Sequence, residues 1–567
     1  MQLMRVNMED LTIKIEEIPP KYEKLGGRGL TSTIIFEEVD PKCDPLGKEN
    51  KLIFSTGLLT ATPCPNSGRL SIGAKSPLTG GIKESNCGGR FSYEMAIKGI
   101  QAIILENQPL SSDLYVLYIS ELENKILKQN DLKSLKNYEL NEKIKKEFGK
   151  NTCHVSIGVA GELKLKASSI ASTDLEGYPD RFAGRGGLGA VMGSKGLKAI
   201  IIKRDTKKSR VVINDLNKFK EISYPYASHL METRKIFSKF GTPLIISTAN
   251  DVGGMPTKNF SIGSFEKVNN IRAEKLHDII IKRKGKYGLP CSPGCVIKCS
   301  NVYKDKKGNR LTKVEYETIV MNGPNLMIDN YDDIVELNWL ENDLGLDTIE
   351  TGAALGVAME GGLLQWGDAE AAKKILNEIP SKAKNGLLIG NGAVAVGKQL
   401  EVVRIPASKG QAFPAYDPRI FKGLSITYMT SSMGADHTSG AAIPGRGGIY
   451  KNKDYGTLED NVGKVDLSRE LQWLIAFIDS TGCCYFIYSG EILNFYSKLL
   501  NIKNGWNITW EDLLEIGKKI TRIEREFNLK AGIEPINKLP EFFYREKLPP
   551  TRRFYDLNHS EIEKIWD

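Results

Sequence analysis

The sequence predicts an α+β protein. We expect a sheet-rich N-terminal base domain in residues 1–204, followed by two mainly α-helical domains in residues 205–407 and 408–567. Short β-branched runs bounded by Gly, Asn or Pro fill the first part. The polar stretch RDTKKSRV (204–211) marks a boundary, and helical spacing of apolar residues follows it. A chain of 567 residues is long enough for several domains of ordinary size.

The individual elements follow in chain order. Residues 11–18 alternate apolar and polar side chains, which is typical of a half-buried strand. Further strands are expected at KLIFSTG, QAIILEN, LYVLYIS, VSIGVAG and KAIIIK. Helices are expected over residues 333–359 and 368–379. The third part mixes Gly-rich loops with the helical stretches LSRELQWLIAFI and WEDLLEIGKKITRIEREF.

Charge and hydropathy exclude several classes of protein. The net charge of +9 comes from scattered basic residues, which argues against nucleic acid but allows an acidic partner. The N-terminal stretch shows no apolar signal region. The longest apolar runs, such as 471–478, are too short to span a bilayer. We therefore expect a cytoplasmic protein with no membrane span, in which nine cysteines do not form a disulfide scaffold.

Three cysteines stand four residues apart at Cys291, Cys295 and Cys299. One buried helix face could carry them, but Pro293 and Gly294 disfavour a helix there. Metal ligation explains a looped run of thiols better. Zinc and a [4Fe–4S] cluster are both open, and the triplet with a remote fourth thiol favours the cluster. Spacing alone does not choose the fourth ligand among Cys43, Cys64, Cys87, Cys153, Cys483 and Cys484.

A glycine-rich loop, AGRGGLGAVMGSKGLKAI (183–200), contains a G-x-G-x-x-G pattern. A dinucleotide site would need a buried strand directly before it, and the preceding DLEGYPDRF is polar and turn-like. We expect instead that its backbone amides approach phosphate and that Arg185 supplies donors. Other Gly-Arg pairs would suit a ligand with several phosphates, although each alone could be an exposed turn: 27–28, 68–69, 89–90 and 445–446.

Several longer motifs together resemble the aldehyde:ferredoxin oxidoreductase family of tungsten, sometimes molybdenum, pyranopterin enzymes. The resemblance runs from about residue 5 to about residue 535. Besides the glycine-rich loop and the cysteine triplet, it rests on GGRGL (26–30), NKLIFSTGLLTATPCPNSGRLSIGAKSPLTGGIKESNCGG (50–89), VEYET (314–318), NDLGLDTIETG (342–352), PAYDPR (414–419), DSTGCC (479–484) and FNLKAG (527–532).

This resemblance implies a set of cofactors buried between the three domains. Two pyranopterins would bind one tungsten or molybdenum, with a [4Fe–4S] cluster close by and magnesium between the pterin phosphates as a further candidate. The family's D-x-x-G-x-C motif selects Cys484 as the fourth cluster ligand beside Cys291, Cys295 and Cys299. Arg69 would lie between cluster and pterin, where its charge could tune the cluster potential.

The resemblance also assigns the remaining contacts. Positions that contact pterin or phosphate in the family match Asn86, Gly88, Ala183, Arg185, Asn342, Asp347, Asp479 and Cys483. Asn342 replaces the family's acidic residue, so it can offer an amide but no carboxylate. Glu317 and His437 match the family's residues near the metal, as general base and carbonyl polariser. Without the resemblance, Glu317 reads as a solvated helix charge and His437 as a core histidine.

Three departures from the family pattern stand out. The cysteine spacing is C-x3-C-x3-C, whereas the best-known members have C-x2-C-x3-C. Where some members carry an E-x-x-H motif that binds a dimer-bridging metal, this chain has Glu336 to Trp339, so a bridging metal is not expected. The sequence after His437, TSGAAIPGRGG, also diverges, which indicates a different pocket lining.

Three functions follow from these observations. The first is oxidation of an aldehyde with water to a carboxylic acid, with electrons passed to ferredoxin or a ferredoxin-like iron–sulfur subunit; a homodimer is compatible with it. The second is a catalytic subunit that reduces another carbonyl or acyl substrate. The third is a zinc-stabilised scaffold that binds a phosphate ligand, and it would be colourless where an iron–sulfur protein is brown.

Overall fold

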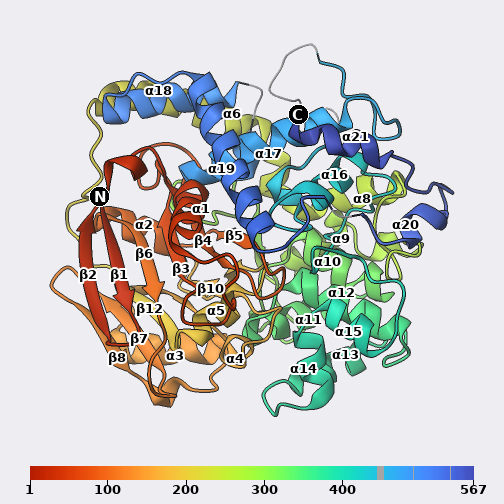
Figure 1. Ribbon diagram of the computed structural model, residues 1–567. Helices are drawn as coiled ribbons and strands as arrows, with labels where there is room; N and C mark the ends of the chain where they lie inside the picture. The colour runs from red at the N-terminus through yellow and green to blue at the C-terminus, as the bar shows by residue number, and fades with distance from the viewer. Residues whose placement is uncertain (444–452, 489–490, 537) are drawn as a thin grey trace.

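The computed structural model describes residues 1–443, 453–488, 491–536 and 538–567 (Figure 1). Two sheets fill the left of Figure 1, and helices occupy its right side and its top. The expected α+β fold, with a sheet-rich N-terminal part followed by helical parts, is confirmed. Among the described residues, no helix combines the length and apolar character that crossing a membrane requires.

Each of two six-stranded sheets contains one parallel pair of strands. The first has the order β2-β1-β6-β3-β4-β5 and the second β11-β10-β9-β12-β7-β8. Strands β1 and β6 pair in parallel, as do β7 and β12, and the other pairs are antiparallel. Their bounds are β1 Gln2–Asn7, β2 Thr12–Glu17, β3 Leu52–Thr56, β4 Leu70–Lys75, β5 Ile82–Cys87, β6 Ile100–Glu106, β7 Tyr115–Ile119, β8 Asn124–Lys128, β9 Thr152–Ser156, β10 Ile170–Ser172, β11 Arg181–Ala183 and β12 Leu197–Lys203.

The apolar runs of the sheets are continuous because their central strands are buried on both faces. In β6, Ile103 and Leu105 enter a core shared by the two sheets, and Ile104 packs under helix α1 (Gly27–Glu38). In β12, Ile200 enters the shared core while Ile201 packs under α3 (Asn137–Phe148). Successive side chains of a strand point to opposite faces, so one strand serves both cores.

The predicted helices are present, with one division. Residues 333–359 form two helices, α11 (Tyr331–Leu344) and α12 (Thr348–Glu360), separated at Gly345, whose φ is +79°. The other helices are α2 Phe91–Ile97, α4 Val159–Glu162, α5 Leu188–Ser194, α6 Leu216–Thr233, α7 Lys235–Phe240, α8 Ile245–Asp251, α9 Ala273–Lys282, α10 Tyr316–Asn322, α13 Ala369–Asn377, α14 Lys384–Gly390, α15 Ala393–Gln399, α16 Lys422–Thr430, α17 Lys464–Thr481, α18 Ile492–Asn504, α19 Trp510–Lys530, α20 Phe542–Arg545 and α21 His559–Glu563. Short strands β13 Lys286–Leu289 and β14 Ser300–Val302 pair with each other, as do β15 Ala407–Ser408 and β16 Gln411–Ala412.

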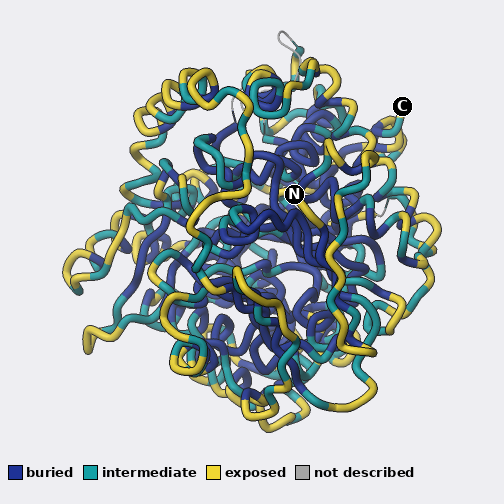
Figure 2. The backbone as a smooth tube through the Cα atoms, turned by 90° about the vertical axis from the view of Figure 1, so that its left-hand side faces the viewer, coloured by how far each residue is buried: buried dark blue, intermediate teal, exposed yellow. Residues whose placement is uncertain are grey.

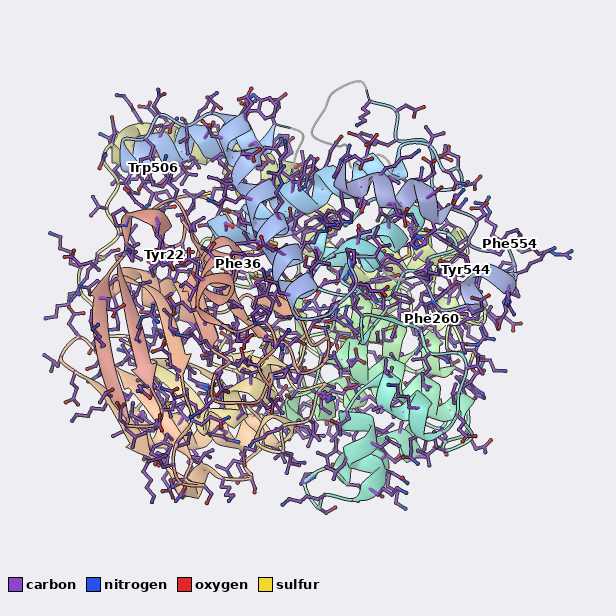
Figure 3. The ribbon with its side chains drawn as sticks, in the orientation of Figure 1. Tyr22, Phe36, Phe260, Trp506, Tyr544 and Phe554 are labelled. Atoms are coloured by element: carbon purple, nitrogen blue, oxygen red, sulfur yellow. The ribbon has the colours of Figure 1, made fainter. Side chains whose placement is uncertain are left out.

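The helical cores do not follow chain order. Phe219 and Leu230 of α6 pack with α17, α18 and α19, whereas α16 and the C-terminal segment pack with α8 to α15. The C-terminal helices also lie on the base (Figure 3): Lys530 stands 5.1 Å from the Phe36 ring, and Lys24 stands 5.9 Å from the Trp506 ring. Buried segments form the centre of the molecule, and exposed segments lie at its periphery, many of them in loops (Figure 2).

Two local expectations were wrong. VSIGVAG (155–161) was expected to be a strand, but β9 ends at Ser156 and helix α4 begins at Val159, after Gly158. The residues before the glycine-rich loop were expected to be turn-like throughout, yet Arg181–Ala183 forms the short strand β11. Because β11 lies at the sheet edge and pairs antiparallel with β10, it is not the central parallel strand that a dinucleotide-binding fold requires.

Candidate active site

A cavity of about 410 Å³ lies where the sheet domain and the helical parts meet. Its walls come from the end of β5, the glycine-rich loop, the cysteine loop, α10, the junction of α11 and α12, and the end of α17. Most of the residues that the sequence singled out line this one cavity: Arg69, Asn86, Gly88, Arg185, Cys291, Cys299, Glu317, Asn342, Asp347, His437, Asp479 and Cys484.

Three predicted site residues are not among the lining residues. Ala183 is buried within β11, where it pairs with Ile170. Cys295 is buried behind Cys291 and accepts a long contact from Asn66 Nδ2 at 3.6 Å. Cys483 places its sulfur 3.9 Å from Cys64 Sγ, so of the two adjacent cysteines only Cys484 reaches the cavity.

The cysteine triplet lies in a loop without helix, as Pro293 and Gly294 predicted. A hydrogen bond with Cys295 lowers the pKa of the Cys291 thiol well below its usual value. The charges of Arg181 and Arg69 lower this pKa further, whereas burial opposes the shift. A thiolate is the metal-binding form of cysteine, so two nearby guanidinium groups favour ligation. Arg181 thus belongs to this end of the site.

The spacing of the thiols bears on which metal group they could hold. A single tetrahedral zinc with Zn–S bonds of about 2.3 Å needs sulfurs about 3.8 Å apart. Within the described part of the chain, only Asp333, Glu336 and Glu370 bring three such ligand atoms within 4.8 Å of one another. The cysteines are therefore too spread for one zinc, whereas a [4Fe–4S] cluster separates its four thiolates by the irons and sulfides between them. The thiol set fits a cluster.

A lysine side chain lies among the three carboxylates of α11 and α13. Lys373 Nζ lies 2.8 Å from Glu336 Oε2 and 3.1 Å from Asp333 Oδ1, and it also contacts Glu370. An ammonium in the middle of these carboxylates neutralises the charge that would otherwise attract a metal ion.

Two of the three arginines that line the cavity, Arg69 and Arg185, donate to backbone carbonyls. Arg185 donates from Nη1 to Ala435 O and from Nη2 to Ala412 O, both at 2.6 Å, and its Nε lies 3.4 Å from Asp347 Oδ2. Arg69 donates from Nη2 to Asn86 O at 2.9 Å and from Nε to the Asn86 side chain. Fixed guanidinium groups at a cavity wall can attract phosphate without reorganising.

Close backbone approach joins these walls. A Cβ added at Gly88 would lie 2.9 Å from Cys291 O, so only glycine lets the end of β5 meet the cysteine loop at this distance. Asn342 donates from Nδ2 to Thr312 Oγ1 at 2.9 Å and to Asn338 Oδ1 at 3.0 Å. Its Nδ2 donors are thus engaged inside the protein, which leaves its oxygen as the atom for a ligand.

Not every Gly-Arg pair contributes to the cavity. Arg28 is buried in a two-point contact with Glu524, at 2.9 and 2.8 Å, and it lies 3.5 Å from Asp479. Arg90 lies 3.7 Å from Glu94. Arg446 lies outside the described residues. The idea that these pairs share one role was therefore wrong for Arg28, which joins α1 to α19.

Glu317 and His437 are in direct contact at the cavity wall. Glu317 Oε1 lies 3.3 Å from His437 Nε2, and Glu317 Oε2 accepts a hydrogen bond from Ala415 N at 2.7 Å. Burial raises the pKa of Glu317 above its usual value, with His437 and the Ala415 amide opposing the shift. His437 Nδ1 is buried without a hydrogen-bond partner among the described residues. Glu317 is thus a cavity residue rather than a solvated helix charge.

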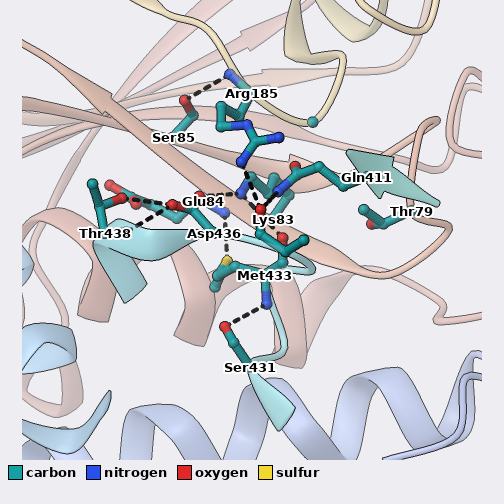
Figure 4. A network of polar contacts seen from close by, with 12 residues as sticks. Thr79, Lys83, Glu84, Ser85, Arg185, Gln411, Ser431, Met433, Asp436 and Thr438 are labelled. Atoms are coloured by element: carbon teal, nitrogen blue, oxygen red, sulfur yellow. Dashed lines mark hydrogen bonds and ion pairs between the residues drawn. The ribbon is translucent and has the colours of Figure 1, made fainter. Parts of the chain in front are cut away.

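A buried ion pair fixes the turn that carries His437 (Figure 4). Lys83 of β5 is fully buried and donates to Asp436 Oδ2 at 2.8 Å and to Met433 O at 3.1 Å. Asp436 Oδ1 accepts from Thr438 N at 3.0 Å, which caps the short helical turn His437–Ser439. Burial alone would raise the pKa of Asp436, but Lys83 and Arg185 outweigh it and the pKa lies well below its usual range.

Sequence reasoning missed Lys83, Asp436 and Arg181. Lys83 sits in a strand whose neighbours are buried, and a lysine is seldom fully buried without a partner. That lysine was a usable signal for a buried ion pair, although its partner lies 353 residues away. Arg181 follows Asp180 rather than a glycine, so the Gly-Arg pattern did not include it.

Comparisons with known proteins agree with this architecture. The family descriptions "Aldehyde ferredoxin oxidoreductase, N-terminal domain" and "Aldehyde ferredoxin oxidoreductase, domains 2 & 3" match residues 3–204 and 221–564. The chain is 34% identical to the tungsten-containing aldehyde ferredoxin oxidoreductase of Thermococcus kodakarensis and 33% identical to that of Pyrococcus furiosus, each over 97% of this chain and 92% of the relative.

Two more distant proteins extend the comparison. The WOR-like subunit of the aliphatic sulfonate oxidoreductase of Pyrococcus furiosus is 28% identical, over 92% of this chain and 84% of the relative. The active site complex BamBC of benzoyl coenzyme A reductase superposes with a TM-score of 0.80, covering 100% of this chain and 93% of that chain, at 19% identity. The latter shows a shared fold. On the two matching domains and the relatives above 30% identity, the chain belongs to the aldehyde ferredoxin oxidoreductase family.

Proposed function

We propose that this protein oxidises an aldehyde with water to the carboxylic acid and passes the electrons through an iron–sulfur cluster to a ferredoxin. The observation that carries the proposal is that one cavity is lined both by candidate cluster ligands and by an acid–base pair. Cys291, Cys299 and Cys484 line it, and so does the contacting pair Glu317 and His437. Such a cavity brings acid–base groups and candidate cluster ligands to one buried space.

The donor set fits the cofactors of the family. Arg69, Arg185 and Asp347 would hold the pterins and their phosphates, and Cys291, Cys295, Cys299 and Cys484 would hold the cluster. When bound, a tungsten or molybdenum pyranopterin would supply the two-electron redox chemistry. Magnesium between the pterin phosphates is part of the proposed cofactor set.

The protein's own contribution is acid–base chemistry and positioning. The raised pKa of Glu317 brings this carboxyl nearer to neutral pH, where a general base that takes a proton from water is most effective. Oε1 is the atom available for that proton, because Oε2 is held by the Ala415 amide. His437 Nε2, beside Oε1, can donate to the carbonyl oxygen of the substrate as negative charge develops on it.

The apolar part of the wall sets the space for the substrate. Tyr416 packs against His437 with ring centres 5.6 Å apart, and Leu424 and Ala441 line the same cavity. Apolar walls favour an uncharged aldehyde and shield the reacting groups from water. We therefore propose a small aldehyde with an apolar substituent as the substrate class.

The test uses protein purified without oxygen. We expect one tungsten or molybdenum and about four irons per chain by mass spectrometry, together with aldehyde-dependent reduction of a viologen dye and formation of the acid. Glu317→Gln should lower turnover by about 10²–10⁴-fold with the metals retained. Glu341→Gln is the matched control: burial raises the pKa of Glu341 well above its usual value, so an amide changes little there.

Other outcomes would contradict the proposal. Zinc in place of iron would refute the cluster. The reductive alternative would be established by a different result. In that case the protein contains its metals and does not oxidise aldehydes, but it reduces an acyl or carbonyl substrate with electrons from a strong reductant. Full turnover by Glu317→Gln would remove this residue from the acid–base role.

A further inference from the structure

The cysteine triplet sits in a segment whose charged residues are all basic. Between Asp278 and Asp305 there is no acidic residue, and there are six basic ones: Lys282, Arg283, Lys284, Lys286, Lys298 and Lys304. The chain as a whole is only mildly basic, with a net charge of +9. The candidate cluster ligands therefore lie within a stretch of local positive charge.

Cys299 lines both the cavity of the proposed active site and a second, small hollow of about 10 Å³. We call this second space the outer hollow, because the exposed residues Lys239 and Tyr287 also line it. Helix α7 covers Cys299 from outside: Ser238 Oγ donates to Ile297 O at 2.6 Å, and a Cβ added at Gly241 would lie 2.7 Å from Cys299 O. The candidate cluster therefore lies close to this face.

Aromatic side chains line the outer hollow. The Phe240 and His277 rings lie 5.3 Å apart, and the His277 and Tyr287 rings lie 4.7 Å apart. All three residues line the hollow together with Cys299, and Tyr287 is 44% exposed. An exposed aromatic ring over a candidate redox centre gives a partner protein an apolar contact at a short distance from Cys299.

Exposed lysines surround this hollow. Lys239 lines it, and Lys235, Lys284 and Lys298 lie on the adjoining elements. These lysines are exposed and have no ion-pair partner among the described residues, whereas Arg283 pairs with Asp332. Unpaired ammonium groups leave a positive potential that attracts acidic proteins. We call the surface formed by α7, the C-terminal end of α9, β13 and the cysteine loop the cysteine face.

We propose that the cysteine face is the docking site of an acidic iron–sulfur protein that accepts one electron at a time. This inference rests on the proposed function, since it needs a cluster at the cysteines. Oxidation of the aldehyde, RCHO + H2O → RCOOH + 2 H⁺ + 2 e⁻, releases two electrons. Each docking event moves one electron from the reduced cluster to the oxidised carrier and neither makes nor breaks a bond, so one turnover takes two docking events.

The test reverses charge on this face. The triple variant Lys235→Glu, Lys239→Glu and Lys284→Glu replaces three unpaired ammonium groups, and none of the three lines the inner cavity. A control variant makes the same charge change at exposed lysines elsewhere: Lys42→Glu and Lys48→Glu on the loop after α1, and Lys398→Glu on α15. Both variants share one net charge, so only the position of the reversed charges differs.

Two measurements separate docking from chemistry. Binding of a purified acidic [4Fe–4S] ferredoxin is measured on immobilised protein as a function of salt, without aldehyde. Aldehyde turnover is then measured with the same ferredoxin and with a viologen dye. We expect the triple variant to bind and reduce ferredoxin at least about tenfold more slowly at low salt, with the viologen rate unchanged and the difference shrinking as salt screens the charges.

Each outcome decides the proposal. Equal losses in the triple and control variants would overturn it, because net charge rather than the cysteine face would be responsible. Ferredoxin binding that is equally tight in the wild type and in the triple variant would overturn it as well. A monomer–dimer shift of the triple variant in sedimentation, with ferredoxin binding intact, would assign the face to a second copy of the chain. If viologen turnover is absent in the wild type, the proposed function fails, while the binding measurement still decides the docking site.

Discussion

Replacing Lys83 by methionine tests the ion pair that fixes the His437 turn. Methionine keeps most of the volume of lysine but leaves the Asp436 carboxylate, whose side chain is 9% exposed, without its nearest cation. Removing one partner of a buried pair costs about 3–5 kcal/mol. With an unfolding entropy of about 2.1 cal/mol/K per residue, 567 residues give about 1.2 kcal/mol/K, so the melting temperature should fall by about 2.5–4 °C.

The pH dependence provides an independent check of the same pair. The pKa of Asp436 is lower in the folded protein than in the unfolded chain, so its stabilising contribution is present above the unfolded value of about 3.9 and is lost as pH falls. The melting difference between wild type and Lys83→Met should therefore keep its full size from neutral pH down to about 3.9 and shrink only as the pH falls below that value, toward the folded-state pKa.

A second variant guards against a trivial packing defect. Adding Asp436→Asn to Lys83→Met should restore part of the lost melting temperature, since an amide needs no counterion and can still accept from Thr438 N. The assay is thermal unfolding followed by circular dichroism at several pH values. The reasoning is refuted if Lys83→Met melts like the wild type at neutral pH, or if the double variant is less stable than the single one.

Three further predictions concern the site. Glu317→Gln should lower aldehyde turnover by about 10²–10⁴-fold, and the wild-type rate should fall as acid protonates Glu317 at its raised pKa; a pH–rate profile checks both. Cys484→Ser should lose iron while Cys483→Ser keeps it, because only Cys484 lines the cavity; iron analysis decides, and equal loss would contradict the assignment. Gly57→Ala should also lower iron retention, since its Cβ would lie 2.0 Å from Gly482 N and push apart the two loops beside Cys484.

Local sequence patterns predicted several of the strands and helices and the looped cysteine triplet. Alternation in residues 11–18 gave a strand, and Pro293 with Gly294 kept the three thiols out of a helix, because these signals act over a few residues. The family motifs also contain most of the residues that line the cavity. The boundaries of the three domains and the roles of the individual site residues stay predictions.

The pairing of distant side chains was decided only by the tertiary structure. Nothing in the Gly-Arg pattern separates Arg28, which pairs with Glu524, from Arg185, which lines the cavity. The partner of Lys83 lies 353 residues further along the chain, so no spacing rule could identify it. Periodicity reports which face of an element is buried, whereas the partner of a buried charge depends on which elements the fold brings to that face.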